Sequence, residues 1–279
     1  MGEEAELPAA IGRYRIVRQV TTGVFGRLLL AHDPALDRRV AIKLFALTDK
    51  AAAAICYDVA EWRRRFVREA RLLARLDHPH IVRVDEMGWH RGEPWLAMPY
   101  LEANLRAEIG CDFDSPGLPE PLRPHAIAPD RAAELLRQVL AALATLHEAG
   151  IVHRDIKPTN LLLTSLAGGT LKLCDFGYAQ IPGQGEPRSD VWFGSSDYIS
   201  REQAQSAAAA TDRSDIYSVG VLAWRMLTGR LPPRGTLPPD LPDGLAALID
   251  AARAADPQAR PSAAAMLAAL GRMRRPAVR

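Results

Sequence analysis

Apolar and polar residues alternate along residues 13–31, on both sides of a Thr-Thr-Gly-Val-Phe-Gly segment. Alternation places every second side chain on the same face of a strand, so this pattern predicts two strands joined by a glycine-containing turn. A third strand is expected over residues 38–47, and further strands follow between Pro79 and Leu101. The amino-terminal part of the chain is therefore predicted to be rich in β-structure, ending near Pro99.

One helix is predicted inside this β-rich region, over residues 61–76. Five of its residues recur at helical spacing and share one face: Trp62, Phe66, Glu69, Leu73 and Leu76. Four of them are apolar and the fifth is an acid. Because an ionised carboxylate on a buried face is costly unless it is paired, we expect Glu69 to have a cation as its partner.

The remainder of the chain is predicted to be mainly helical. Five prolines within residues 111–130 indicate an irregular surface connection. Helices are then expected over residues 130–149, over residues 211–229 and from residue 262 to about 270. The second of these begins with capping-type residues, ends at a glycine and is apolar on nearly every side, which indicates a buried helix.

Composition narrows the possible classes of protein. The chain has 279 residues, 48% hydrophobic and 24% charged, which is ample for one large globular domain or two modest lobes. A formal charge of +2 gives no overall basic field, so nucleic acid is not an expected partner.

Cysteine usage and the absence of long apolar runs indicate the compartment. Three cysteines at scattered positions, Cys56, Cys111 and Cys174, fit neither a disulfide framework nor a paired metal site. The amino terminus has no apolar signal core, and no run of about 18 apolar residues occurs. We therefore expect a cytoplasmic protein that is not embedded in a membrane.

Candidate chemistry is concentrated in the segment HRDIKPTN, residues 153–160. The residues after it predict two short strands around a Gly-Gly turn, the second of which leads to Asp175. This arrangement is expected to bring Asp155, Asn160 and Asp175 together. A carboxylate and an amide oxygen from separate segments suit Mg²⁺, which leaves a second carboxylate to receive a proton.

These motifs, in this order, resemble the eukaryotic-type serine/threonine protein kinases, most closely their bacterial members, from residue 13 to about 270. The resemblance implies an α+β, bilobal protein kinase fold, with a small β-rich N-lobe carrying one regulatory helix and a larger, mainly helical C-lobe. The implied divisions are an N-terminal extension (1–12), the N-lobe (13–98), a hinge (99–101), the C-lobe (102–271) and a basic tail (272–279).

The resemblance also assigns roles to individual residues. Asp155 corresponds to the acceptor of the substrate proton and Lys157 to the residue that steadies the transferred phosphoryl group. Lys157 also favours Ser/Thr over Tyr specificity. Lys43 corresponds to the lysine that contacts the α- and β-phosphates, and Glu69 to its partner. The implied nucleotide-binding positions are Thr21, Gly23, Gly26, Leu28, Ala41, Lys43, Met98, Pro99, Tyr100, Leu101 and Leu162.

Other implied positions hold metal or stabilise the fold. Asn160 and Asp175 correspond to the metal ligands, with ATP and Mg²⁺ as cofactors and Mn²⁺ as an alternative ion. Asp215 corresponds to a buried acid that holds the backbone around residues 153–155. Glu202 and Arg260 correspond to an ion pair that closes the C-lobe.

The chain departs from the family pattern at several points. Thr21 replaces the first glycine of the phosphate loop, and Gly23 and Gly26 on their own also fit an ordinary hairpin turn. Residues 230–244 leave no room for the usual substrate-docking helix, so a narrow set of substrates is expected. The proline-rich connection or the basic tail is then expected to supply replacement contacts.

Activation is left open by the sequence. An arginine before the catalytic aspartate, here Arg154, binds a phosphate on the activation segment in the family, and Ser189 is the best acceptor for that phosphate. Glu186 and Asp190 are acidic residues that offer Arg154 a partner without phosphorylation. Both arrangements agree with the sequence.

The implied function is transfer of the γ-phosphoryl group of Mg-ATP to a Ser or Thr hydroxyl of a protein substrate, with autophosphorylation. A pseudokinase scaffold and a small-molecule kinase are the alternatives. The expected partners are protein substrates, with no nucleic acid and no membrane, and the expected state is a monomer or weak dimer.

Overall fold

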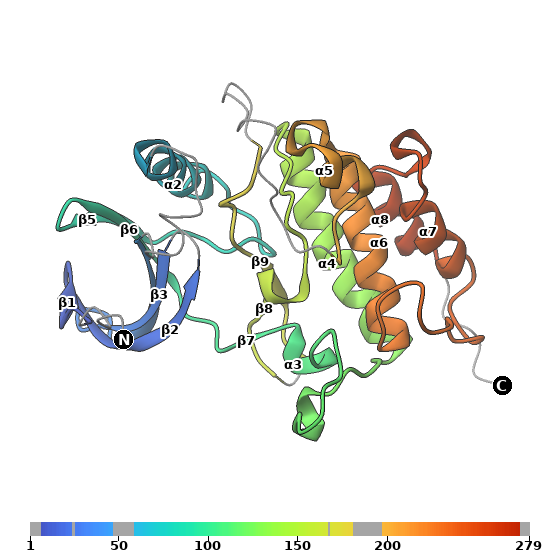
Figure 1. The fold of residues 1–279 in the computed structure, drawn as a ribbon, viewed down its shortest axis with the longest axis horizontal. Coiled ribbons are helices and arrows are strands. Elements are labelled where there is room, and N and C mark those ends of the chain that lie inside the picture. The colour runs from blue at the N-terminus through green and yellow to red at the C-terminus, as the bar shows by residue number, and fades with distance from the viewer. Residues whose placement is uncertain (1–6, 24–25, 47–58, 167, 181–196, 274–279) are drawn as a thin grey trace. The chain divides into compact units, whose positions relative to one another are not determined.

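The computed structural model describes residues 7–23, 26–46, 59–166, 168–180 and 197–273 (Figure 1). The chain forms two compact units, Met1–Leu101 and Glu102–Arg279. The first is built around a β-sheet and the second mainly from helices, so the predicted α+β class, with a β-rich first part and a mainly helical second part, is confirmed.

The first unit is a six-stranded antiparallel sheet with the order β1-β2-β3-β4-β6-β5. Its strands are β1 (Ala10–Ile11), β2 (Tyr14–Gly23), β3 (Gly26–Asp33), β4 (Arg38–Phe45), β5 (Glu86–His90) and β6 (Glu93–Pro99). Side chains of β2, β3, β4 and β6 form an apolar core that includes Tyr14, Leu29, Ile42 and Trp95. The predicted strands are therefore present, although β4 ends at Phe45, before residue 47.

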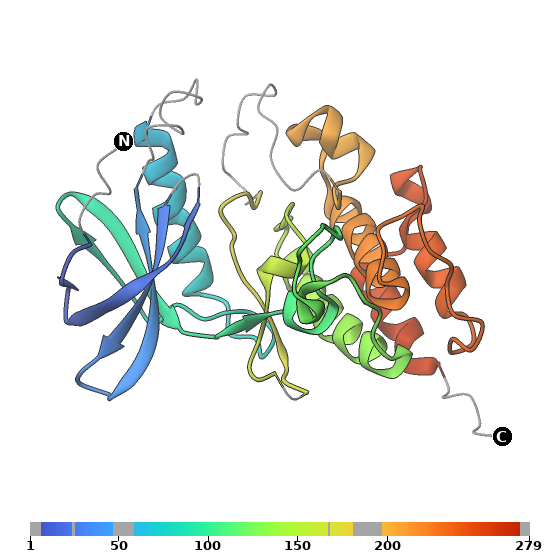
Figure 2. The same ribbon diagram turned by 60° about the horizontal axis from the view of Figure 1, so that its bottom comes forward.

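Helix α2 (Val59–Leu73) packs against β6 of this sheet (Figure 2). Four of the five residues that were predicted to share one face of this helix are buried: Trp62, Phe66, Glu69 and Leu73. The prediction for Leu76 is wrong, because the helix ends at Leu73 and the Leu76 amide donates to the Leu73 carbonyl in a tighter turn. Pro79 follows closely, and a proline disfavours helical backbone in the residue before it.

The second unit contains most of the helices. They are α3 (Arg106–Ile109), α4 (Pro129–Glu148), α5 (Arg201–Gln205), α6 (Asp212–Thr228), α7 (Leu245–Ala252) and α8 (Ala263–Arg272). A three-stranded sheet has the order β7-β8-β9, with β7 (Ala103–Asn104), β8 (Leu161–Leu163) and β9 (Leu171–Leu173). Short 3₁₀ turns are η1 (Glu120–Leu122), η2 (Pro158–Asn160), η3 (Ala207–Ala209) and η4 (Pro257–Ala259).

Helix α6 is the central helix of the second unit and contacts both α4 and α7. Thr211 and Ser214 form a reciprocal capping box at its start, and Gly229 ends it with φ of 69°. A residue with a Cβ atom rarely adopts that backbone conformation, which explains the glycine. Most side chains of α6 are buried, as the apolar pattern predicted.

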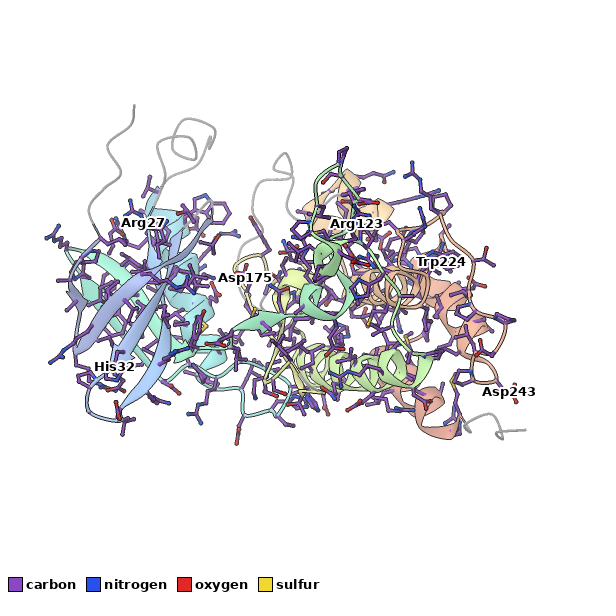
Figure 3. The ribbon with its side chains drawn as sticks, turned by 90° about the horizontal axis from the view of Figure 1, so that it is seen from below. Arg27, His32, Arg123, Asp175, Trp224 and Asp243 are labelled. Atoms are coloured by element: carbon purple, nitrogen blue, oxygen red, sulfur yellow. The ribbon has the colours of Figure 1, made fainter. Side chains whose placement is uncertain are left out.

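Residues 230–244 contain no helix, and every residue of that segment is described. The segment instead packs beside α6, where Trp224 Nε1 donates to the Arg234 carbonyl at 2.9 Å. The guanidinium of Arg253 also lies over the Trp224 ring, 4.4 Å from its centroid; Trp224 is labelled in Figure 3. The predicted absence of a helix from this segment is therefore confirmed.

An ion pair between Glu202 and Arg260 connects α5 to the residue that follows η4. Arg260 donates to both carboxylate oxygens, at 2.6 Å and 3.1 Å, and its side chain is almost fully buried. Burial raises the pKa of Glu202, but hydrogen bonds from Arg260, Ser200 and Ser214 outweigh burial and lower the pKa to about 2. The carboxylate therefore stays ionised in the folded protein well into acid.

Glu202→Gln is expected to lower the free energy of unfolding at pH 7 by about 2 to 3 kcal/mol, because a buried guanidinium loses its charged partner. The native pKa of Glu202 lies below its unfolded value of 4.5. Its contribution is thus complete above pH 4.5 and is lost as the pH falls towards 2. Urea unfolding of both proteins across this range should show the difference shrinking. Glu134→Gln, which changes a half-exposed ion pair, is the control and should have little effect.

Candidate active site

In the first unit, Lys43 and Glu69 form a direct ion pair. Lys43 Nζ lies 2.8 Å and 3.1 Å from the two carboxylate oxygens of Glu69. The Glu69 side chain is only 5% exposed, so the cation that its buried position required is Lys43. The lysine also lies 5.8 Å from the ring centroid of Phe66, which favours a positive charge there.

The nucleotide-binding candidates of this unit lie on four strands of the sheet and the residues after them. Thr21 and Gly23 are on β2, Gly26 and Leu28 on β3, Ala41 and Lys43 on β4, and Met98 and Pro99 on β6, with Tyr100 and Leu101 following β6. The strand register pairs Thr21 with Leu28, Gly23 with Gly26, Leu28 with Lys43, and Ala41 with Met98. Leu162 is on β8 of the second unit.

Gly23, at the end of β2, and Gly26, at the start of β3, differ in whether their surroundings leave room for a side chain. A Cβ atom on Gly26 would lie 2.6 Å from the Leu44 carbonyl oxygen of the neighbouring strand, whereas one on Gly23 would make only ordinary contact. Close backbone approach therefore accounts for Gly26 independently of any nucleotide. Gly23 and Gly26 pair across the antiparallel β2–β3 ladder, which agrees both with a phosphate-binding loop and with the hairpin alternative.

In the second unit, Asp155 is the centre of a compact polar group. Its side chain is buried, and Lys157 Nζ lies 2.7 Å from Oδ2. Asn160 Nδ2 donates to Oδ2 and to the backbone carbonyl of Asp155, both at 2.8 Å. Because the amide nitrogen is used in this way, the amide oxygen of Asn160 is the atom left to act as a ligand.

Asp215, at the start of α6, fixes the backbone of this loop. Its two oxygens accept from the amides of His153 and Arg154, each at 2.8 Å, and Oδ2 lies 2.9 Å from His147 Nε2. Burial alone raises the pKa of Asp215, but these hydrogen bonds and the neighbouring histidines lower it below its ordinary value. The acid holds Arg154 at φ of 68°, so the loop is kept in an uncommon backbone conformation.

Asp175 follows β9 and also has a left-handed backbone, with φ of 62° (Figure 3). The segment that carries it is tied to the Asp155 loop, because the Cys174 amide donates to the Asn160 carbonyl at 3.0 Å. The Cys174 carbonyl lies 3.1 Å from His153 Nε2, and the Phe176 ring packs at 4.8 Å against the ring of His153. Cys174 itself is half-buried.

The possible metal ligands are one carboxylate, from Asp175, and one amide oxygen, from Asn160. Among the described residues, no three or more His, Cys, Asp or Glu side chains gather as a metal site. A small set of hard oxygen ligands suits an ion that takes the rest of its coordination from water and substrate phosphate. The residues present therefore fit a hard divalent cation that keeps water and phosphate among its ligands.

Two glutamines support the Asp155 loop and were missed in the sequence. Gln180 pairs with Val152 through two backbone hydrogen bonds, and its side-chain oxygen accepts from Arg154 Nη2 at 2.6 Å. Gln203 Nε2 donates to the Arg154 carbonyl at 2.7 Å. A glutamine has no periodic or motif signal, so neither contact was predictable. Glu186, Ser189 and Asp190, the predicted partners of Arg154, lie outside the described residues.

Comparison with known proteins places the chain in a family. Residues 14–269 match the protein kinase domain, so the chain belongs to the protein kinase family. Members of this family use ATP and a divalent metal ion and act on proteins.

Its relatives include three bacterial proteins named as serine/threonine-protein kinases. The chain is 36% identical over 232 residues to pkn2 of Myxococcus xanthus, covering 81% of this chain and 26% of that protein. It is 35% identical to PrkC of Bacillus subtilis, over 79% of this chain and 31% of that protein. It is 34% identical to PknL of Mycobacterium tuberculosis, over 79% of this chain and 50% of that protein. The chain thus spans about a quarter to a half of the length of these curated relatives. None of the described helices has the length and apolar character needed to cross a membrane.

Proposed function

We propose that the chain is an ATP-dependent serine/threonine protein kinase, which transfers the γ-phosphoryl group of ATP to a hydroxyl of a protein substrate. One observation carries this proposal: a buried carboxylate, Asp155, lies against Lys157 and Asn160 in a loop held by Asp215. A carboxylate in that setting can accept the hydroxyl proton, while the adjacent ammonium group stabilises charge on the transferred group.

The remaining residues have positioning and electrostatic roles in this proposal. Lys43, held by Glu69, contacts the α- and β-phosphates. Asn160 and Asp175 hold the metal ion, which we propose to be Mg²⁺, with Mn²⁺ as a substitute. When bound, the ion supplies positive charge to the phosphates. Phosphoryl transfer depends mostly on such positioning and charge, so well-supported side chains are what the reaction requires.

A pseudokinase scaffold is the weaker alternative, because every catalytic and metal position carries the residue type that the chemistry needs. We propose protein substrates over small molecules, since Glu202 and Arg260 form the ion pair expected of protein-directed family members. We also propose a reducing cytoplasm as the place of action, supported by the free thiols of Cys111 and Cys174. A monomer or weak dimer remains our proposal for the assembly.

Incubation of the purified chain with labelled ATP and Mg²⁺ tests the function. We expect readily detected autophosphorylation on Ser or Thr and weak labelling of a generic basic protein, because the docking helix is missing. EDTA should abolish both, and Mn²⁺ should restore them in part. Nucleotide binding without any transfer would favour a scaffold. Labelling of an aminoglycoside or another small alcohol, but of no protein, would favour the small-molecule kinase.

A further inference from the structure

The backbone of Arg154 has an uncommon conformation immediately before Asp155. Its φ is 68°, in the left-handed region that residues with a Cβ atom rarely adopt. Such a conformation persists only where the surrounding structure fixes it. Two dihedral angles of Arg154 have to be fixed, φ on the side of His153 and ψ on the side of Asp155. The direction in which the Asp155 side chain points depends on both.

Asp215 fixes the first of these angles. Its carboxylate accepts from the amides of His153 and Arg154, each at 2.8 Å. The Arg154 amide belongs to the peptide group that precedes this residue, so holding it fixes φ. The peptide group that follows Arg154 leads directly into Asp155, and rotation about ψ turns the carbonyl and the amide of that second group together.

Gln203 holds this second peptide group. Its Nε2 donates to the Arg154 carbonyl at 2.7 Å, and its side chain is buried, with 3% exposed. The other end of the same peptide group is the Asp155 amide, which lies 3.3 Å from His153 Nδ1. The hydrogen bond from Gln203 is therefore the shorter of these two bonds, and it fixes ψ of Arg154.

The two side chains that hold the Arg154 backbone belong to connected helices. Gln203 is on α5 and Asp215 is on α6. The hydroxyl of Ser214, the neighbour of Asp215, donates at 2.9 Å to the carboxylate of Glu202, the neighbour of Gln203. The two supports therefore keep their positions relative to each other, and the loop is held between them.

A glutamine suits this position because its amide is a neutral hydrogen-bond donor. The bond between Gln203 and the Arg154 carbonyl lies in the protein interior. An apolar side chain at position 203 would leave a buried carbonyl without that donor, which is costly. A carboxylate at this position would place two acceptor oxygens against each other.

We propose that Gln203 is a positioning residue for phosphate transfer. It fixes the peptide group before Asp155 and thereby directs the Asp155 carboxylate towards the substrate hydroxyl. Gln203 acts through the Arg154 carbonyl and not on the substrate itself. The inference rests on the proposed kinase function. Because a misplacement of about 1 Å can lower a rate about a hundredfold, loss of this one hydrogen bond should affect turnover as well as stability.

Gln203→Met tests the proposal, because methionine has a similar length and volume but no donor. We expect kcat, measured at saturating ATP with the generic basic protein as acceptor, to fall about tenfold or more, while KM for ATP stays within about twofold. Gln203→His keeps an N–H donor at a similar distance from the main chain and should retain about half of the wild-type kcat or more. This rescue separates loss of the hydrogen bond from a change in packing.

Gln138→Met is the matched control. Gln138 is a second buried glutamine of the same unit, with 8% exposed. Its side chain also binds a backbone group, but outside the Asp155 loop, because it accepts from the Leu171 amide at 2.6 Å. Gln138→Met should lower the midpoint of urea unfolding about as much as Gln203→Met does, yet leave kcat within about twofold of the wild-type value.

Hydrogen exchange of residues 151–157, followed by mass spectrometry, gives a second measurement that does not depend on activity. Exchange should be faster in Gln203→Met than in the wild-type protein, Gln203→His or Gln138→Met. A wild-type kcat in Gln203→Met, or an equal loss of kcat in Gln138→Met, would overturn the proposal. If the wild-type chain transfers no phosphate, the kinase function alone fails. Faster exchange confined to Gln203→Met would then still support the role of Gln203 in holding the loop, and unchanged exchange would overturn it.

Discussion

Asp155→Asn should lower kcat by about two orders of magnitude or more and leave the fold intact. The amide has nearly the same shape as the carboxylate, but it cannot accept the hydroxyl proton and does not offset the charge of Lys157. Contacts of Asn160 with the backbone of residue 155 remain possible. The loss should therefore appear in kcat, measured at saturating ATP, while KM for ATP changes little.

Asp243→Asn is the control for this measurement. Asp243 is exposed and lies at the far end of the same unit from Asp175 (Figure 3). Its variant should have wild-type kcat, and thermal unfolding of both variants should match the wild-type protein. An Asp155→Asn protein that keeps more than about a tenth of the wild-type kcat would show that another group accepts the proton.

The local parts of the site were predictable because their signals lie within short stretches of sequence. The helical spacing of Trp62, Phe66 and Leu73 placed Glu69 on a buried face, and burial of an acid required a cation. The two short strands around residues 161–173 were likewise predicted from the Gly-Gly turn between them. Such inferences need only neighbouring residues and the period of one element.

Some contacts within the second unit were not predictable, because they join residues that are far apart in the sequence. Asp112 accepts a hydrogen bond from Tyr198, which lies 86 positions later in the sequence. It also forms an ion pair with Arg225, which lies more than a hundred positions later. Nothing in the pattern around Asp112 distinguishes it from other acids in a proline-rich loop. The end of α2 was also missed, since an apolar residue at helical spacing, Leu76, continues the pattern beyond the last helical turn. Tertiary structure, and not periodicity, decides both cases.

Lys43→Met should abolish detectable phosphate transfer, with a loss of about a hundredfold or more, because the phosphates lose the cation that positions them. The same change leaves the buried carboxylate of Glu69 without the ammonium group that lies 2.8 Å away. Removing one partner of a buried pair is costly, so we expect about 3 kcal/mol of lost stability as well. Activity alone therefore cannot separate a catalytic role of Lys43 from a structural one.

The double variant Lys43→Met with Glu69→Gln separates the two roles. A neutral amide at position 69 no longer needs a cation, so most of the stability lost in Lys43→Met should return in chemical unfolding. Transfer activity should not return, since Lys43 itself is needed at the phosphates. Recovery of activity together with stability would mean that Lys43 serves only to neutralise Glu69. A fully active and stable Lys43→Met protein would contradict both roles. The ion pair between Lys43 and Glu69 would then contribute nothing to folding or to chemistry.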